Sequence, residues 1–217
     1  MGEDRAGERR SAGVGVLDRV VAILDAVETL PMGASELARH LGLSVPTAYR
    51  LVSAMVGHGL LRRDSDGRLH IGLRFASTAL AAAATPVLAD LSRRTGETAQ
   101  VWVRRGEHRL CLACVESPSE LRASLPVGTL LALADGGSAA QVLTAPPDPA
   151  RGWVESVSKR TPGLCSVSAG VHYGSEVVAA VCLAAPVSRV KPEGPGAQWG
   201  ELVTAAALRL EEVLLYR

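Results

Sequence analysis

The strongest constraint on the fold is a run of three short amphipathic helices followed by a hairpin. Apolar residues recur at helical spacing from Val14 to Val27, and two shorter helices are expected over residues 34–41 and 44–58. Residues 60–71 alternate around a Gly-containing turn, which is typical of two short paired strands. Helix, helix, turn, helix and hairpin within residues 14–72 together predict a winged helix-turn-helix.

The third helix has the composition of a DNA-recognition helix. Ser44 is a good N-cap residue and Pro46 is tolerated in the first helical turn. The N-terminal end of a recognition helix enters the major groove first, where Ser44 and Thr47 can hydrogen-bond, Tyr49 can contact phosphate or pack on a methyl group, and Arg50 can read guanine. The alternative is that Tyr49 and Arg50 only cover the outside of a winged helix that binds protein.

The hairpin carries positive charge in a chain of nearly neutral balance. The formal net charge is only +1, which argues against a broad basic surface. Arg62, Arg63 and Arg68 are concentrated in the hairpin, with His70 beside them, where they would lie along a phosphate backbone or a minor groove. A solvated charged hairpin remains the alternative for this segment alone.

Length and composition indicate two domains and no membrane segment. Two domains are the starting expectation for 217 residues, of which 47% are apolar. The longest apolar run, Val177–Val187, is well short of the roughly 20 residues that a spanning helix needs. Residues 1–13 mix acids with arginines and are expected to be a disordered tail, not a secretory signal, which predicts a cytoplasmic protein.

Behind the hairpin, the pattern predicts a linker helix and then an α+β domain. An alanine-rich stretch favours a linker helix over residues 73–86, where small side chains would let a second copy approach. Residues 87–217 are expected to form an antiparallel α+β sensing domain. Within it, helices are predicted at 87–94, 138–143, 155–159 and 201–215, and strands at 98–103, 110–116, 122–125, 165–172 and 176–185.

The four cysteines are interpreted as reduced structural thiols. Cys111 and Cys114 form a C-x-x-C on an expected strand, where an offset of three sends the two side chains to opposite faces and disfavours a shared metal ion. No metal and no cofactor is predicted. One alternative function is a DNA-binding redox sensor that responds through Cys165 or Cys182, which would require exposed thiols of lowered pKa.

Catalysis is not predicted. The sequence contains no H-E-x-x-H, G-x-S-x-G or Walker motif, and its five histidines are scattered without metal-ligand spacing. The protein is therefore not expected to be an enzyme.

A candidate effector site lies where Asp135-Gly136-Gly137-Ser138 opens a helix. Free backbone N–H groups and the helix dipole there can hold a carboxylate without any lysine or arginine, which would suit small organic acids or amino acids. The alternative is that Gly136-Gly137 is only a tight loop.

These residues also carry a family resemblance. The segments GVGVLDRVVAILDAVETLP, ELARHLGLSVPTAYRLVSAMVGHGLL, RRDSDGRLHIGLR and RTGETAQVWVRRG resemble the IclR family of bacterial transcriptional regulators over nearly the whole chain. The segments LRASLPVGT, GGSAAQVL, RGWVESV and PGLCSVSAGV are most similar to the actinobacterial NdgR-type regulators of amino-acid metabolism, including leucine biosynthesis.

The resemblance implies a homodimer or homotetramer that binds double-stranded DNA at a near-palindromic operator, as repressor, activator or both. It also implies a GAF-like C-terminal domain that binds a small-molecule effector. The effector positions carried over from the family motifs are Leu121, Leu130, Gly136, Gly137, Ser138, Ala139, Glu155, Gly163, Cys165, Cys182 and Ala184.

Two departures from the family pattern bear on this pocket. Between Ala145 and Arg151 the chain has only PPDPA, where a longer segment with a further helix is expected, so one wall of the pocket would be trimmed. Cys182 and Ala184 stand where serines are common, which predicts a less polar pocket.

Overall fold

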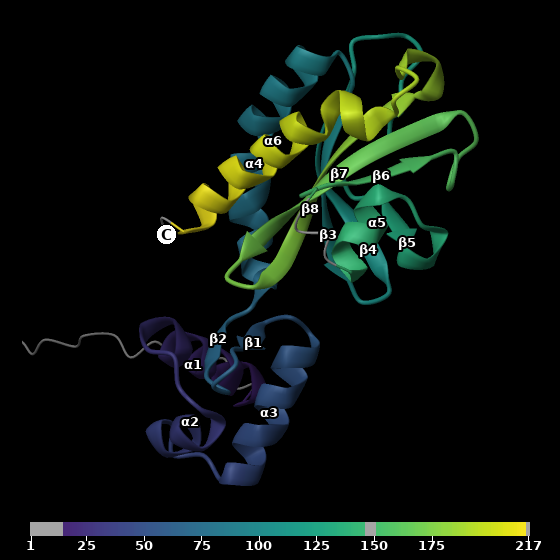
Figure 1. The fold of residues 1–217 in the computed structure, drawn as a ribbon. Helices are drawn as coiled ribbons and strands as arrows, with labels where there is room; N and C mark the ends of the chain where they lie inside the picture. Colours follow the sequence, from purple (N-terminus) through teal and green to yellow (C-terminus); the bar gives the residue numbers. More distant parts are fainter. Residues whose placement is uncertain (1–14, 146–150, 216–217) are drawn as a thin grey trace, which may run out of the picture. The chain divides into compact units, whose positions relative to one another are not determined.

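The computed structural model describes residues 15–145 and 151–215, which form two compact units, Met1–Phe75 and Ala76–Arg217. The expected tail over residues 1–13 and the trimmed segment PPDPA lie outside the described residues. Each unit has its own sheet and its own hydrophobic core (Figure 1).

The first unit is the predicted three-helix domain with a hairpin. Its elements are α1 (Gly15–Thr29), α2 (Ala34–His40), α3 (Val45–Gly57), β1 (Leu61–Arg63) and β2 (Leu69–Ile71). The strands pair antiparallel, and Leu69 N–H also donates to the Met32 carbonyl, which ties the hairpin to the connection between α1 and α2. The core consists of apolar side chains from all five elements: Ile23, Ala26, Val27, Met32, Ala34, Leu37, Val52, Met55, Leu61 and Leu69.

A single helix, α4 (Leu73–Thr95), replaces the two helices expected around Thr85-Pro86. Pro86 lies inside it, although a proline in a helix interior removes a hydrogen bond and costs about 3 kcal/mol. Leu80, Ala84, Leu88 and Leu91 are nevertheless buried along one continuous face. Burial of that face outweighs the local cost, which sequence pattern alone does not show.

The second unit is built on a six-stranded antiparallel sheet of order β5-β4-β3-β8-β7-β6. The strands are β3 (Thr98–Arg105), β4 (His108–Val115), β5 (Leu130–Ala132), β6 (Val154–Val157), β7 (Leu164–Tyr173) and β8 (Glu176–Pro186). Its helices are α4 from Ala76 onward, α5 (Ser138–Thr144) and α6 (Pro195–Leu215), with single 3-10 turns η1 (Leu133–Asp135) and η2 (Val187–Arg189). The α+β class is therefore confirmed.

The two faces of the sheet are covered differently. Figure 1 shows α6 and α4 side by side on one face and α5 on the other, and Arg209 of α6 is ion-paired with Asp90 of α4 at 3.0 Å. Side chains alternate along β7, so Ser166 and Ser168 face α5 whereas Val167 is buried on the opposite face. The α5 side is thus the polar side of the sheet.

Two local predictions were wrong in this unit. Residues 155–159 were expected to be helical, but Val154–Val157 form the edge strand β6 paired with β7. Residues 122–125 were expected to be a strand, whereas the short strand next to β4 is Leu130–Ala132. Both segments are too short for periodicity to separate helix from strand, and pairing with a neighbouring strand decides the outcome.

The prediction that Cys111 and Cys114 point to opposite faces of the sheet was also wrong, because β4 contains an irregularity. The register shifts so that Trp102 lies opposite Cys111 while Gln100 lies opposite Cys114, leaving Leu112 as the extra residue. Gln100 and Trp102 share one face, where Trp102 Nε1 donates to Gln100 Oε1 at 3.2 Å. Both thiols therefore lie on the same face of the sheet, not on opposite faces.

Candidate functional site

Helix α3 presents one buried face and one exposed face. Ala48, Val52 and Met55 are buried at helical spacing, whereas Tyr49 and Arg50 project into solvent. The burial of the first set fixes the rotation of the helix and leaves the second set on the outside. This exposed face matches the position predicted for base contacts.

The N-terminal turn of α3 is polar and organised by side chains. Ser44 has the extended backbone of an N-cap residue, but its hydroxyl donates to Thr47 Oγ1 at 2.8 Å and makes no side-chain capping bond. Pro46 is exposed in the first turn, and the Tyr49 hydroxyl lies 3.4 Å from Ser35 Oγ of α2. Of the predicted contact residues of this helix, Thr47 is partly buried and the others are exposed.

Asp64 organises the hairpin between β1 and β2. Its carboxylate accepts hydrogen bonds from the backbone N–H groups of Asp66 and Arg68, at 3.0 and 2.8 Å, and from His70 Nε2 at 2.7 Å. The hydrogen bond from His70 holds the pKa of the Asp64 carboxyl below its usual value. The turn is thereby held in one shape.

The hairpin arginines have different surroundings. Arg68 Nη1 donates to the Pro31 carbonyl at 2.8 Å, so this guanidinium already braces the hairpin against the α1–α2 connection. Arg63 is exposed, and its contact with the Gly67 carbonyl is long, at 3.4 Å, while Arg62 is partly buried on the opposite side of β1. Of the three predicted phosphate contacts, Arg63 is the most available.

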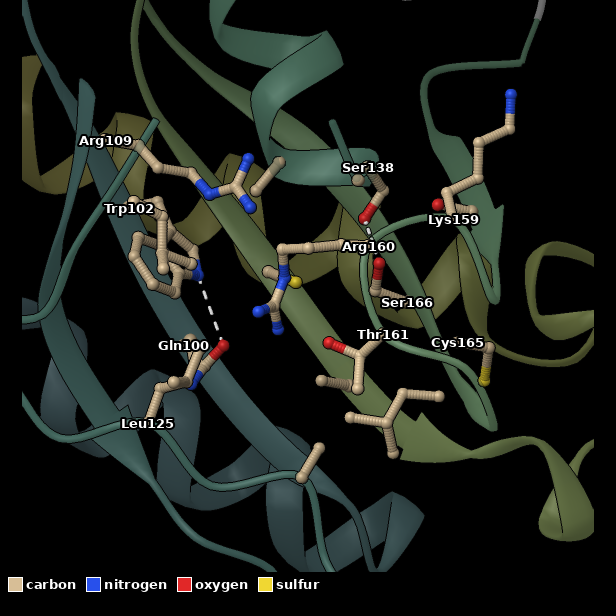
Figure 2. Close-up of a pocket in the computed structure, with 18 of the residues that line it drawn as sticks. Gln100, Trp102, Arg109, Leu125, Ser138, Lys159, Arg160, Thr161, Cys165 and Ser166 are labelled. Atoms are coloured by element: carbon tan, nitrogen blue, oxygen red, sulfur yellow. Dashed lines mark hydrogen bonds between the residues drawn. The ribbon is translucent and has the colours of Figure 1, made fainter. Parts of the chain in front are cut away.

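The second unit contains a pocket of about 260 Å³ on the α5 side of the sheet (Figure 2). Its walls come from all six strands of the sheet, the start of α5 and two loops. The lining residues are Gln100, Trp102, Arg109, Ala123, Ser124, Leu125, Leu131, Gly137, Ser138, Ala139, Ser156, Lys159, Arg160, Thr161, Leu164, Cys165, Ser166, Cys182 and Ala184.

The Gly136-Gly137 segment bends the chain into α5 beside this pocket. The φ angles of the two glycines are 75° and 93°, which side chains rarely adopt, so the turn requires residues without a Cβ. Ser138 follows and is fully buried, with its hydroxyl 2.7 Å from both Ser166 Oγ and Ser168 Oγ. The serine cluster fastens the start of α5 to β7.

Arg109 is a buried cation in the wall of the pocket. The side chain is 3% exposed, its Nη1 donates to the Gly136 carbonyl at 2.7 Å, and its guanidinium lies 5.4 Å from the centre of the Trp102 ring. Its Nε is buried without a hydrogen-bond partner among the described residues. This burial leaves the positive charge poorly solvated and lowers the pKa of Arg109. An anion in the pocket would compensate it.

Two further cations line the pocket, and no carboxylate does so among the described residues. Arg160 and Lys159 come from the loop between β6 and β7, and Figure 2 shows the Arg160 guanidinium within the cavity while the Lys159 ammonium extends away. A cavity lined by one sign of charge with low-dielectric walls concentrates counterions. The pocket is therefore suited to small anions.

The structure brings together some of the predicted effector residues. Gly137, Ser138, Ala139, Cys165, Cys182 and Ala184 all line the pocket. Gly136 borders it through the carbonyl that binds Arg109. Gly163 belongs to the loop that carries Arg160, but is not in the lining.

The other predicted residues lie elsewhere. The Glu155 carboxylate accepts a hydrogen bond at 2.8 Å from Gly196 N–H at the start of α6, on the other side of β6 from the pocket residue Ser156. Leu121 and Leu130 are 64% and 58% exposed and are absent from the lining.

Sequence reasoning missed the cations of the pocket. It anticipated an anion held without lysine or arginine, but Arg109, Lys159 and Arg160 all line the cavity. A signal for Arg109 was present in the sequence: it lies two residues before Cys111, on the inward face of an alternating strand. An arginine is rarely buried there unless it is paired with another group. Arg160 lies in a loop without such a pattern.

Cys111, Cys165 and Cys182 are buried, and Cys114 is partly buried. Burial raises the pKa of Cys111 to about 12 and that of Cys165 to about 11, and it also raises the pKa of Cys114 and Cys182. A reactive thiol needs a lowered pKa and access to solvent. These surroundings disfavour a redox response through Cys165 or Cys182. Among the described residues, no group of three or more side chains is placed to hold a metal ion.

We therefore expect the folded protein to resist thiol reagents. At mildly alkaline pH, modification by an aromatic disulfide should be at least about tenfold slower in the native protein than in urea, because thiolate is the reacting species. The measurement is absorbance of the released thiol, with peptide mass mapping of the modified sites. Rapid native modification of Cys165 or Cys182 would instead revive the redox alternative.

Comparison with known families gives the same division of the chain. Residues 16–65 match the IclR helix-turn-helix domain, and residues 74–151 match the family described as bacterial transcriptional regulator IclR C-terminal. Within the described residues, no helix is both long and apolar enough to span a membrane.

Individual relatives extend the similarity to nearly the whole chain. The transcriptional regulator BhcR of Paracoccus denitrificans is 26% identical over 92% of this chain and 88% of its own, and the repressor AllR of Klebsiella pneumoniae is 26% identical over 93% and 90%. These relatives are transcriptional regulators, not enzymes.

Solved structures share the fold. An IclR-family regulator from Rhodococcus sp. superimposes with a TM-score of 0.59 at 24% identity, over 97% of this chain and 98% of its own. An IclR homologue from Microbacterium hydrocarbonoxydans, solved with 4-hydroxybenzoate, gives 0.56 at 20% identity, over 93% and 100%. With a matching helix-turn-helix domain, a matching C-terminal domain and full-length relatives, the chain belongs to the IclR family of bacterial transcriptional regulators.

Proposed function

We propose that the protein binds a near-palindromic operator through α3 and the β1–β2 hairpin, and that a small carboxylate in the second unit changes this binding. DNA binding is assigned to residues 14–72, the linker to 73–86 and effector binding to 87–217. The observation that supports an anionic effector is the buried, incompletely paired guanidinium of Arg109, in a pocket whose lining residues include no carboxylate.

The charge of the pocket and the ligand bound to a relative both favour a small carboxylate. The relative solved with 4-hydroxybenzoate holds a small carboxylate. Here the cavity of about 260 Å³ is smaller than the roughly 300 to 1,000 Å³ typical of sites for drug-sized ligands. A metabolite of a few carbon atoms with an anionic group fits both size and charge. A role in amino-acid metabolism rests on sequence resemblance alone.

Self-association is supported by the exposed apolar side of α1. Val16, Leu17 and Val21 are each more than half exposed on this helix. Adjacent exposed apolar side chains mark an association surface more often than isolated ones do. A homodimer, or a pair of dimers, would also match the symmetry of a near-palindromic operator.

The first experiment is binding of the purified full chain to its own upstream DNA at fixed salt. Leucine, branched-chain 2-oxo acids and 4-hydroxybenzoate are then titrated into the complex. Salt is held constant because phosphate contacts alone change affinity by orders of magnitude. Specific binding that one of these compounds changes would support both halves of the proposal. Specific DNA binding that none of these compounds changes would contradict the proposal that a small carboxylate of this class acts as the effector.

Arg50→Ala should weaken binding to the operator by about 10- to 100-fold, because loss of a bidentate base contact costs about 1–3 kcal/mol. Binding to unrelated DNA should change much less. Arg19→Ala, which removes an exposed arginine from α1, serves as the charge control. Equal losses on operator and unrelated DNA would show that Arg50 contacts only phosphate and reads no base.

A further inference from the structure

Two arginines from different walls place positive charge at separate points of the pocket. Arg109 belongs to β4 and is held by the Gly136 carbonyl and the Trp102 ring. Arg160 belongs to the loop between β6 and β7, and Figure 2 shows its guanidinium between Trp102 and Thr161, apart from that of Arg109. One cation is fixed in the wall and the other reaches in from a loop.

These charges are not neutralised from within the pocket. None of the lining residues is Asp or Glu. Burial is the main cause of the lowered pKa of Arg109, and the charge of Arg160 lowers it further; the carboxylate that opposes this effect, Asp135, does not line the pocket. Both guanidinium groups also act on the Cys182 thiol of β8, where burial keeps the thiol neutral. The two cations therefore repel each other across a cavity that offers no counter-charge.

The surfaces between and around the cations indicate the shape of a ligand. Leu125, Leu131 and Ala184 contribute apolar side chains to the lining. Thr161 and Ser166 add hydroxyl groups on the Arg160 side, as Figure 2 shows. A short chain with an apolar middle and an anionic group at each end would complement this distribution.

We propose that the pocket takes a small dianion, with one anionic group bound by Arg109 and the second by Arg160. The shared chemistry is two anionic groups on a short carbon chain, supplied by a dicarboxylate or by a carboxylate that carries a phosphoryl group. This inference rests on the proposed function, because it assumes that the pocket is the effector site. A monocarboxylate would occupy Arg109 and leave Arg160 unpaired.

The test is isothermal titration calorimetry of the full chain with the unbranched dicarboxylates from malonate to pimelate. Each is compared with the monocarboxylate of equal carbon number at the same ionic strength and neutral pH. The phosphonate analogues of the best-binding lengths distinguish a phosphoryl group from a second carboxylate. We expect one or two chain lengths to bind at least about tenfold more tightly than their monocarboxylates, because each 1.4 kcal/mol of added interaction is a factor of ten.

Variants then assign the second anionic group to its residue. Arg160→Ala should remove the preference for dianions while leaving monocarboxylate affinity unchanged, and Arg160→Lys should keep part of it. Arg160 is exposed on a loop, so folding should not depend on it. Lys191→Ala, an exposed cation of the same unit outside the pocket, should alter neither affinity.

The outcomes separate the two proposals. Equal affinity for dicarboxylates and monocarboxylates, or a preference that survives Arg160→Ala, would overturn the dianion inference and leave the effector site in place. Failure of every compound to bind at millimolar concentration would overturn the inference as well. The operator titration then decides independently whether any effector acts.

Discussion

Replacing Arg109 by methionine should lower the affinity of the pocket for its anionic effector by about 30-fold or more. Removing one partner of a buried charge pair costs about 2–5 kcal/mol. Methionine keeps the unbranched stem that packs beside Trp102 but removes the cation and the hydrogen bond to the Gly136 carbonyl. Operator affinity without effector should stay unchanged, so the variant should bind DNA and no longer respond.

The measurement is ligand titration followed both by calorimetry and by release of operator DNA. Arg104→Met, at an exposed position of β3, is the matched control because it removes the same charge outside the pocket. The folded state should survive Arg109→Met, since the wild-type guanidinium is itself poorly solvated and has an unpaired Nε. Effector affinity within a factor of about three of the wild type would place the site elsewhere.

Replacing Arg189 by methionine should destabilise the second unit by about 3 kcal/mol, the lower end of the cost of breaking a buried ion pair. Glu97 is 3% exposed, and both of its carboxylate oxygens accept from Arg189, which also donates to the Leu121 carbonyl at 2.9 Å. Without the guanidinium, a buried carboxylate lacks its counter-charge. The hydrogen bond to Glu97 also raises the pKa of Arg189, as expected of a paired cation.

Urea unfolding followed by tryptophan fluorescence measures the stability of the second unit directly. All three tryptophans, Trp102, Trp153 and Trp199, lie in the second unit, so the signal reports on that unit alone. The double variant Glu97→Leu, Arg189→Met should lose less stability than Arg189→Met alone, because replacing both partners leaves no unpaired charge. If the free energy of unfolding of Arg189→Met lies within about 0.5 kcal/mol of the wild type, water replaces the arginine beside Glu97.

The helix-turn-helix unit was predictable because its signals are local. In α3, Val45, Ala48, Leu51, Val52 and Met55 recur at helical spacing and predict an apolar stripe; Ala48, Val52 and Met55 are buried, Leu51 is partly buried and Val45 is exposed. The β1–β2 hairpin follows from alternation around a glycine turn. The β7–β8 hairpin was also anticipated, within one residue at each end. Each element satisfies its own backbone or pairs with its neighbour in sequence.

The errors arose where packing or pairing with another element overrides the local pattern. β6 is a strand because β7 supplies its hydrogen bonds, and α4 continues through Pro86 because one side of the helix is buried. The irregularity in β4 places Cys111 and Cys114 on one face, which residue spacing alone argued against. In each case the free energy of packing or pairing exceeds a local preference of a few kcal/mol or less.

The sequence by itself determined the family, the winged helix-turn-helix, the α+β class of the second unit and the exposed residues of α3. It also located the Gly136-Gly137-Ser138 wall of the pocket. Only the tertiary structure decided the charge of that pocket, because Arg109 and Arg160 are far apart in sequence and meet only when β4 and the β6–β7 loop enclose one cavity. Periodicity reports which side of an element is buried, whereas a binding site depends on which elements face one another.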